Sequence, residues 1–333
     1  MKEILPGIFL IKEKGAFGAF KPEENIYVFA GHDGIICDAG YGNKRAVRKL
    51  VKKIRKIEEH YKAQNKPFKI TRVLVSHSHP DHFSGLELLR RYLGVKVVLT
   101  KKTAEIIKNK ETFVRRSHPT NEQLMKIDYS KIRKFLNKMS VQLMRLIYTP
   151  LYGINFFGDP HEIIEENSEI LINGEVWRIF PSPGHASDHI SLYNEEKGIL
   201  FSGDNILRVK TTWLGPPNSN LRDYMDSLEY TFNLPNLKLI LSSHGRTIEN
   251  PKERIKVILD NRRRRTEQVR ELIQKNSGAG ITPKEIIKAL YPKENKIKQE
   301  IARGWIVLTL KYLEEENLIR REVGKKEIRF FPV

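Results

Sequence analysis

Short apolar runs separated by glycine and polar residues mark the first hundred residues of the chain. Four of these runs, bounded by turn residues, predict strands at residues 26–31, 34–40, 72–77 and 96–100. Residues 44–64 and 85–92 predict helices between and after them, the first because its apolar residues share one helical face. Strands that alternate with helices indicate a layered α/β arrangement.

The pattern becomes helical and basic over residues 101–160, which we interpret as an insertion. Strands return between residues 169 and 203, with hairpin turns predicted at Asn173-Gly174 and Lys197-Gly198. A further apolar run, residues 237–242, leads to His244. We therefore assign residues 1–250 to a first domain.

A second unit is predicted for residues 251–333. A long helix begins at Pro251 and ends near Lys275, before a glycine-containing break. Thr282 and Glu285 have the spacing of a capping box, which predicts the start of a second helix. A third helix over 296–316 and a strand–turn–strand ribbon complete the element order of a winged helix.

The composition of the 333 residues fits a globular protein, with 40% hydrophobic and 30% charged residues. No apolar run approaches the ~20 residues that a bilayer-spanning helix needs. The single cysteine, Cys37, has no partner for an internal disulfide, and a cytoplasmic location is expected. Many charged residues beside little cysteine and methionine are typical of a thermophile.

The net charge of +19 is unevenly distributed. Residues 101–150 carry 12 basic against 4 acidic residues, and residues 251–333 carry 21 against 12. Residues 151–250 reverse the sign, with 7 basic against 14 acidic. A polyanionic substrate such as RNA is one interpretation of the basic segments, and a solvated charged surface is the other.

Metal-capable side chains recur where an apolar strand runs into a loop containing glycine. The four stretches are "VLVSHSHPDHFSG", "WRIFPSPGHASDH", "GILFSGDN" and "LILSSHGRT". Five of the ten histidines and two aspartates fall at these strand ends: His77, His79, His82, His185, His244, Asp81 and Asp204. Imidazole and carboxylate ligands suit Zn²⁺, Fe²⁺ or Mn²⁺.

The spacing of these residues predicts more than one metal ion. In an extended segment His77 and His79 point to the same side, because side chains alternate with period two. Pro80 then turns the chain, so that Asp81 and His82 can face a neighbouring site. Seven candidate ligands exceed the needs of one tetrahedral ion, and two ions are the natural number.

The order of these motifs resembles the metallo-β-lactamase superfamily of hydrolases, over residues 1 to about 250. The resemblance implies an α+β fold, an αββα sandwich with the metals at one edge. It implies that one metal is held by His77, His79 and His185, and the second by Asp81, His82 and His244. Asp204 would bridge the two. Asp38 matches the family's early Asp-x-Gly and would steady the ligand loop.

Two divalent ions, with Zn²⁺ expected and Mn²⁺ or Fe²⁺ as alternatives, would generate hydroxide from a bridging water at neutral pH. Asp81 is expected to orient that hydroxide. His189 is expected either to contact the substrate or leaving group, or to be purely structural. Expected substrate-binding residues are Lys101, Lys102, Arg115 and, from the insertion, His118.

Superfamily membership does not choose the bond that is broken. A catalytic domain of this kind followed by a winged helix resembles the β-lactamase-like protein 2 group, whose characterised member cleaves single-stranded RNA. We therefore expect an endoribonuclease whose partner is single-stranded nucleic acid or another anionic substrate. No contact with a membrane is expected, and the chain could form either a monomer or a homodimer. The alternatives are a glyoxalase II-like thioester hydrolase, another small-ester or lactone hydrolase, and a nucleic-acid-binding regulator.

The C-terminal unit also contains candidate contacts for nucleic acid. The tetrad Arg262 to Arg265 is expected to reach phosphates, with Trp305, Tyr312 or Phe330 available for stacking on bases. On a helix no single face can hold four consecutive residues, so the alternative is a mostly solvated tetrad. The alternative for the aromatic residues is burial in the core.

Overall fold

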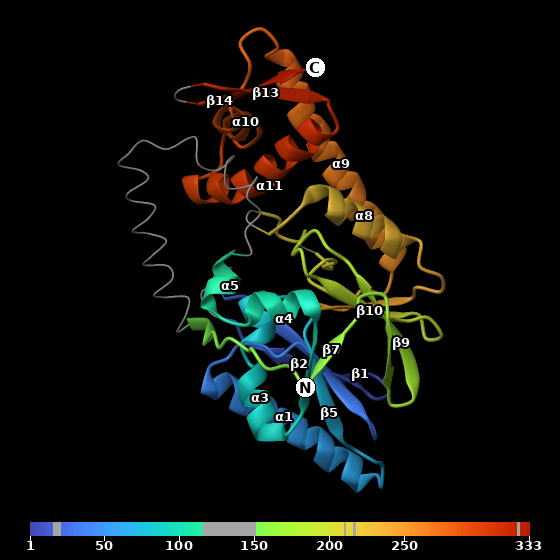
Figure 1. Ribbon diagram of the computed structural model, residues 1–333. Coiled ribbons are helices and arrows are strands. Elements are labelled where there is room, and N and C mark those ends of the chain that lie inside the picture. Colours follow the sequence, from blue (N-terminus) through green and yellow to red (C-terminus); the bar gives the residue numbers. More distant parts are fainter. Residues whose placement is uncertain (16–20, 116–150, 210, 216–217, 325–326) are drawn as a thin grey trace.

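A computed structural model describes residues 1–15, 21–115, 151–209, 211–215, 218–324 and 327–333 (Figure 1). Its first sheet has seven strands that lie in chain order. The neighbours from β1 to β4 are antiparallel, and those from β4 to β7 are parallel. The strands are β1 (Lys2–Leu5), β2 (Ile8–Glu13), β3 (Glu24–Phe29), β4 (Gly34–Cys37), β5 (Ile70–Leu74), β6 (Lys96–Thr100) and β7 (Glu162–Ile164).

Helices connect the parallel strands, since a parallel pair requires a crossover. Helix α1 (Lys44–Ala63) joins β4 to β5, and Asn43 caps it by accepting a hydrogen bond from the Ala46 amide at 2.9 Å. The short α2 (Pro80–Phe83) and α3 (Leu86–Leu93) join β5 to β6. After β6 come α4 (Lys101–Ile107) and α5 (Lys110–Arg115). The strands and helices predicted for the first hundred residues are confirmed.

The second sheet contains five strands in the order β12-β11-β10-β9-β8. They are β8 (Glu169–Ile172), β9 (Glu175–Pro181), β10 (Ile190–Asn194), β11 (Ile199–Gly203) and β12 (Leu239–Ser242). Asn173 and Gly174 form the two-residue turn between β8 and β9, both with positive φ (53° and 83°). Gly198, at φ 70°, turns the chain between β10 and β11. Both predicted hairpins are confirmed.

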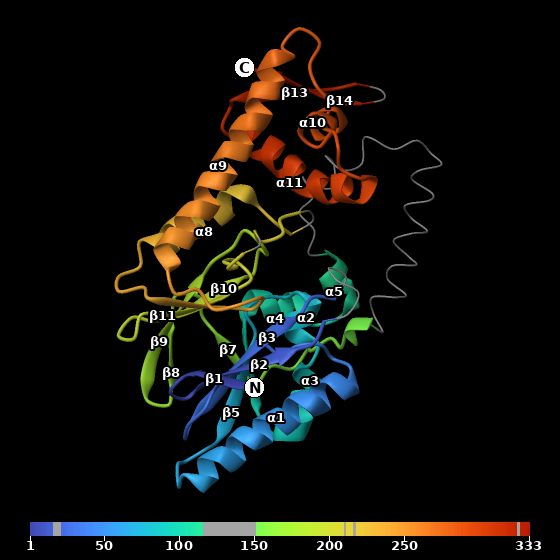
Figure 2. The same cartoon turned by 180° about the vertical axis from the view of Figure 1, so that it is seen from behind.

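The two sheets pack face to face between layers of helices (Figures 1 and 2). Alternation along β3 shows the layering: Tyr27 and Phe29 face the second sheet, whereas Ile26 and Val28 face the helices α1 and α3. Phe29 meets Trp177 of β9 edge to face, with ring centroids 4.9 Å apart. Helices α8 (Leu221–Phe232) and α9 (Pro251–Lys275) cover the outer face of the second sheet.

Helix α9 belongs to two hydrophobic cores. Its first half places Ile255 and Ile258 against the second sheet and α8. Its second half places Val269 and Ile273 in a separate core with the C-terminal elements. These are α10 (Pro283–Leu290), α11 (Lys296–Glu315), β13 (Ile319–Val323) and β14 (Ile328–Pro332). A domain boundary at residue 250 stays a prediction, since the helix that follows it packs on both sides.

The expected helix signals in this C-terminal part are confirmed. The Thr282 hydroxyl accepts from the Glu285 amide at 3.2 Å, and the Glu285 carboxylate accepts from the Thr282 amide at 2.8 Å, which completes the capping box. The helix predicted over 296–316 corresponds to α11. Just beyond it, Asn317 has a left-handed conformation at φ 56°.

The expected insertion at residues 101–160 is described only at its ends. Its first part forms α4 and α5, in agreement with the helical prediction. Residues 116–150, which include His118, lie outside the described residues. Within the described ranges, no helix has the length and apolar character required to cross a bilayer.

The sheet-to-sheet core is the main source of stability of the sandwich. Replacing Trp177 with alanine removes an indole that is 1% exposed, so the free energy of unfolding should fall by about 3–5 kcal/mol. Urea denaturation measures this loss. Leu171→Ala on neighbouring β8 is the control, because Leu171 is 57% exposed and its loss should cost little. Equal losses in the two variants would contradict the packing described.

Candidate metal centre

The metal-capable residues lie in loops at the ends of four strands. The loop after β5 carries His77 and His79 and enters α2, where Pro80 is the first helical residue and turns the chain. His185 lies between β9 and β10. Asp204 follows β11 and His244 follows β12. The parallel pairing of β11 with β12 places these last two loops at the same edge of the sheet.

A first group of donor atoms is formed by His77, His79, His185 and Asp204, whose ligand atoms lie within 4.8 Å of one another. The Nδ1 atom of His79 is 2.9 Å from Nε2 of His77 and 2.9 Å from Nε2 of His185. The Asp204 Oδ2 atom is 3.4 Å from Nε2 of His185. Three imidazole nitrogens and one carboxylate oxygen form a donor set that suits Zn²⁺.

A second group adjoins the first through Asp204. The Asp204 Oδ1 atom is 3.3 Å from Nε2 of His244, and its Oδ2 atom is 3.6 Å from Nε2 of His82. The Asp81 carboxylate also lies near these two nitrogens. Its Oδ1 atom is 3.8 Å from Nε2 of His82, and its Oδ2 atom is 3.9 Å from Nε2 of His244. Asp204 thus contacts residues of both groups, and the bridging role expected for it stays a prediction.

Some of the donor atoms in these two groups have no hydrogen-bond partner within the described ranges and are therefore available to bind cations. Nε2 of His82 and Oδ1 of Asp204 are buried and have no hydrogen-bond partner among the described residues. Unsatisfied buried polar atoms are costly unless an ion or water meets them. Together, the two groups provide ligands for two divalent ions.

Hydrogen bonds at the far side of the rings select the ligand nitrogen. A histidine whose Nδ1–H is held by an acceptor presents Nε2 as the neutral donor. The Nδ1 atoms of His82, His185 and His244 each contact an acceptor, at 2.8, 2.8 and 2.6 Å: the Asp38 carboxylate, the Trp213 carbonyl and the Glu23 carbonyl. The rings are therefore oriented in advance of metal binding.

The structure places Asp38 directly behind the loop that carries His77 and His79, where it contacts His82; its supporting role in metal binding stays a prediction. It is fully buried at the end of β4, with φ 67°. Its Oδ1 accepts from the Ser76 amide at 2.8 Å, and its Oδ2 accepts from Nδ1 of His82 at 2.8 Å and from the Ser243 hydroxyl at 3.1 Å. One carboxylate thereby ties together the two loops that carry His77 and His244.

Glu24, at the start of β3, was not predicted from the sequence. Its carboxylate is completely buried, 3.4 Å from Nδ1 of His82 and 3.3 Å from Nδ1 of His244. It approaches the two rings from their Nδ1 side, and one of its oxygens lies within 4.8 Å of donor atoms of Asp81, His82 and His244, so that Glu24 is itself a candidate member of the second group. The available signal was weak, because "PEEN" resembles an ordinary polar turn before a strand.

Burial and neighbouring charges have opposite effects on the pKa values of His82 and Asp204 in this centre. Burial by itself would lower the pKa of His82, but the Glu24 and Asp38 carboxylates outweigh it and hold that pKa well above its usual value. For His77, burial and the adjacent imidazoles hold the pKa well below its usual value. Burial would raise the pKa of Asp204, yet the His244 and His82 imidazoles hold it well below the ordinary value. Metal ions binding here compete with the protons of the second group.

The catalytic role expected for His189 is not supported by its surroundings, and its structural alternative is. The ring is 1% exposed, and burial and His185 lower its pKa to about 3. Nε2 accepts a hydrogen bond from the Asp204 amide at 3.1 Å, which leaves the Nδ1 proton to the Ser182 hydroxyl at 2.8 Å. A Cβ on Gly203 would lie 2.5 Å from Nε2, so only glycine fits there. His189 positions the Asp204 loop.

The expected substrate-binding residues have different environments. The Lys102 ammonium donates a hydrogen bond to the Ser187 carbonyl, two residues beyond His185. Lys101 and Arg115 are exposed, and neither makes a hydrogen bond or ion pair within the described residues. Only Lys102 is therefore brought to a ligand loop, and His118 is outside the described ranges. Trp213, missed in the sequence, touches the site through its carbonyl bond to His185.

A family model described as the metallo-beta-lactamase superfamily matches residues 23–244, which include all seven candidate ligands. The chain belongs to the metallo-β-lactamase superfamily. Membership agrees with the resemblance identified in the sequence and with the two groups of ligands. Membership and the two groups of candidate ligands support a metal-dependent hydrolase.

Curated relatives from the superfamily cover different parts of the chain. A beta-lactamase-like protein 2 homolog of Caenorhabditis elegans is 27% identical over 186 residues, 56% of this chain and 59% of the relative's length. Probable metallo-hydrolase YqjP of Bacillus subtilis is 26% identical and covers 81% of this chain and 82% of its own. An atrochrysone carboxyl ACP thioesterase of Aspergillus fumigatus is 26% identical over 44% of this chain and 49% of its own.

Among solved structures, a β-lactamase domain protein from Burkholderia ambifaria aligns with a TM-score of 0.78 at 19% sequence identity. The alignment covers 100% of this chain and 93% of that protein. It shows that the overall fold, including the C-terminal elements, is shared.

The position of Glu24 leads to a test of the second metal. Glu24→Gln keeps the shape of the side chain but replaces the carboxylate beside His82 and His244 with a neutral amide. Affinity for one of two Zn²⁺ ions should fall about 10–100-fold, because groups that orient ligands carry this much affinity. Titration calorimetry with Zn²⁺ measures both steps. The matched control is Glu23→Gln, whose exposed carboxylate pairs with Lys12 and whose carbonyl contact with His244 is retained. Unchanged affinity in Glu24→Gln would refute the role.

The environment of His189 predicts how its replacement alters catalysis. His189→Ala should slow the hydrolysis of ester substrates by a similar factor whether the leaving group is p-nitrophenol or a simple alcohol, because positioning of Asp204 affects both alike. A general acid would be needed far more for the poor leaving group. Rate constants for a matched pair of p-nitrophenyl and alkyl substrates make the comparison. Ser182→Ala, which removes the Nδ1 acceptor, should produce a smaller loss of the same kind. A loss confined to the alkyl substrate would restore the catalytic role.

Proposed function

We propose that this hydrolase is a phosphodiesterase that cleaves single-stranded RNA with the help of two divalent ions, Zn²⁺ first among them. The observation that carries the proposal is the pairing of a cation and an aromatic ring around the His185 loop. Lys102 contacts this loop on one side through the Ser187 carbonyl, and Trp213 contacts it through Nδ1 of His185.

Trp213 has the properties of a platform for bases. Its side chain is 50% exposed although its carbonyl is bound to His185. The preceding residue is anchored, since Arg262 of α9 donates to the Thr212 carbonyl at 2.9 Å. A base stacked on an aromatic side chain contributes about 1–3 kcal/mol of binding, without dependence on base identity. An exposed indole on a backbone segment that is bonded to His185 supports a single-stranded substrate.

Metal ions bound in the two groups would lower the pKa of a water molecule and neutralise charge that develops on a phosphoryl oxygen. The chain's own residues then orient the reactants. Asp81 is 8% exposed and belongs to the second group, where its carboxylate can accept a proton from the attacking water. The Lys102 ammonium can bind a non-reacting phosphate of the strand.

The C-terminal unit, residues 251–333, supports a nucleic-acid substrate through its element order and charge. Three helices followed by a two-stranded antiparallel sheet have the order of a winged helix, which we propose as its fold. It carries 21 basic against 12 acidic residues. A basic surface of this kind attracts polyanions.

Thioester hydrolysis is the second candidate function. It is favoured by the similarity to the fungal protein named as an acyl carrier protein thioesterase. The donor set serves a thioester carbonyl as well as a phosphodiester. In a thioesterase, Lys102 and Trp213 would contact the carrier's acyl or phosphopantetheine group instead of RNA.

A direct comparison of substrates tests the proposal. The Zn²⁺- or Mn²⁺-loaded protein should cleave end-labelled single-stranded RNA, and Asp81→Ala should reduce the rate at least 100-fold. Lys102→Gln and Trp213→Ala should each raise KM more than they lower kcat, because both residues contact the strand rather than the reacting bond. Lys101→Gln is the control for Lys102→Gln, since its neighbouring exposed ammonium lacks the contact with the His185 loop.

A different pattern of activity would contradict the proposal. Rapid turnover of an acyl thioester, with no cleavage of RNA under the same metal and salt conditions, would refute the endoribonuclease proposal and establish the thioesterase. Cleavage of RNA that Asp81→Ala leaves unchanged would point to a contaminating nuclease.

A further inference from the structure

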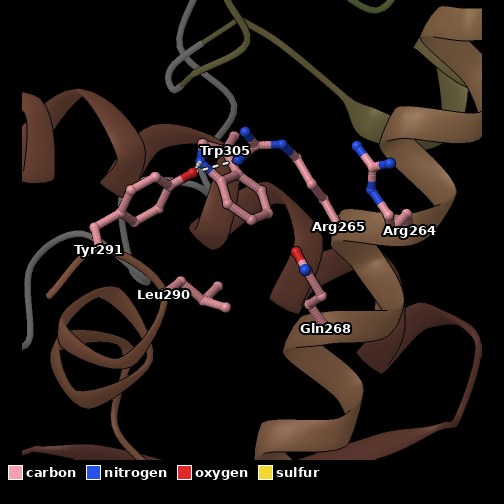
Figure 3. Close-up of a pocket in the computed structure, with 6 residues that line it drawn as sticks. All are labelled: Arg264, Arg265, Gln268, Leu290, Tyr291 and Trp305. Atoms are coloured by element: carbon pink, nitrogen blue, oxygen red, sulfur yellow. Dashed lines mark hydrogen bonds between the residues drawn. The ribbon is translucent and has the colours of Figure 1, made fainter.

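A pocket of about 310 Å³ opens in the C-terminal unit, and none of its lining residues is a candidate metal ligand (Figure 3). Helix α9 contributes its right-hand wall, and the end of α10 with α11 contributes the left-hand wall. Its volume lies at the lower end of the range for ligand pockets, about 300–1,000 Å³. The lining residues are Arg264, Arg265, Gln268, Leu290, Tyr291 and Trp305.

The arginine tetrad of α9 divides into three kinds of residue. Arg262 is buried and donates to the Thr212 carbonyl. Arg263 forms an ion pair with Glu229 at 2.7 Å. Arg264 and Arg265 both line the pocket, and within the described part of the chain neither pairs with a carboxylate. Two guanidinium groups with no anionic partner beside one cavity favour an anionic ligand.

The opposite wall presents aromatic side chains held in place by hydrogen bonds. The Tyr291 hydroxyl accepts from Nε1 of Trp305 at 3.1 Å and from the Arg265 guanidinium. Its own proton has no acceptor among the described residues, which leaves it available to a ligand oxygen. The Arg265 guanidinium also lies 5.2 Å from the centre of the Trp305 ring.

We infer that this pocket binds one nucleotide of a single-stranded nucleic acid. Arg264, Arg265 and the Tyr291 hydroxyl contact the phosphate, and the base packs against Trp305 and Leu290. Gln268, which projects into the pocket from α9, is placed to bond a base edge. This inference rests on the proposed RNA substrate and adds a second binding position for the strand, outside the metal centre.

Binding of RNA to the full metal-loaded chain tests the pocket. The Asp81→Ala background prevents cleavage, and anisotropy of a fluorescein-labelled 20-nucleotide single strand reports the Kd. Arg264→Gln with Arg265→Gln should weaken binding at least tenfold. It should also make the slope of log K against log salt shallower, by about 0.7 for each phosphate that an arginine no longer neutralises. The matched control is Arg263→Gln with Arg270→Gln, which removes the same charge from the same helix at residues paired with Glu229 and Glu267.

A second variant separates stacking from charge. Trp305→Leu should weaken binding about tenfold with an unchanged salt dependence, because it removes a ring and not a cation. In the cleavage-competent chain, these variants should hydrolyse bis(p-nitrophenyl) phosphate at the normal rate, which shows that the protein is folded and the metal centre intact. If Trp305→Leu hydrolyses bis(p-nitrophenyl) phosphate more slowly than the unmodified chain, only the double arginine variant is used to judge RNA binding in the pocket.

The outcomes distinguish the pocket from the proposed function. Equal weakening by the arginine pair and its control, or no weakening by the arginine pair, would overturn the pocket while leaving RNA cleavage to its own assay. Tight, pocket-dependent binding of RNA by a chain that does not cleave it would keep the pocket and refute the endoribonuclease. A chain that binds no single-stranded RNA overturns the inference.

Discussion

The carboxylate of Asp38 is the interaction on which the metal centre depends. From the end of β4 it accepts hydrogen bonds from the loop after β5, from His82 within α2, and from Ser243 after β12. Its backbone is left-handed at φ 67°, a conformation that costs energy for a residue with a Cβ atom. The hydrogen bonds offset this cost, and without them the loops that carry the two ligand groups would have no common anchor.

Polar groups behind the ligands continue this pattern. The Nδ1 sides of three histidines meet a carboxylate or a backbone carbonyl, so their Nε2 atoms converge on Asp204. Nε2 of His189 accepts a hydrogen bond from the Asp204 amide and so fixes the backbone of that loop. Four acidic residues, Glu24, Asp38, Asp81 and Asp204, are buried in and around the two groups. Burial of so much charge is tolerable only when cations share the site.

Helix α9 connects this centre to the C-terminal unit. Its first half packs on the second sheet, and Arg262 and Arg254 bond the carbonyls of Thr212 and Leu207 in the loop that leads to Trp213. Its second half forms one wall of the pocket with Trp305. An RNA strand bound at both the metal centre and the pocket would therefore contact two sites that the same helix supports. This arrangement suits a substrate of several nucleotides.

The sequence by itself determined the elements and singled out the candidate ligands that the structure gathers into two groups. Strand and helix periods depend on neighbouring residues, and the seven ligands stand out because each follows an apolar strand. Tertiary structure alone decided the rest. Glu24 belongs to the centre only because β3 is brought beside His244, and the Asp38–Ser243 bond joins residues 205 positions apart. The same holds for His189, whose two nitrogens are satisfied by Ser182 and Asp204, and for the tetrad, in which Arg262 is buried and Arg265 lines a pocket. Which atoms converge depends on long-range contacts, and these leave no periodic trace in the chain.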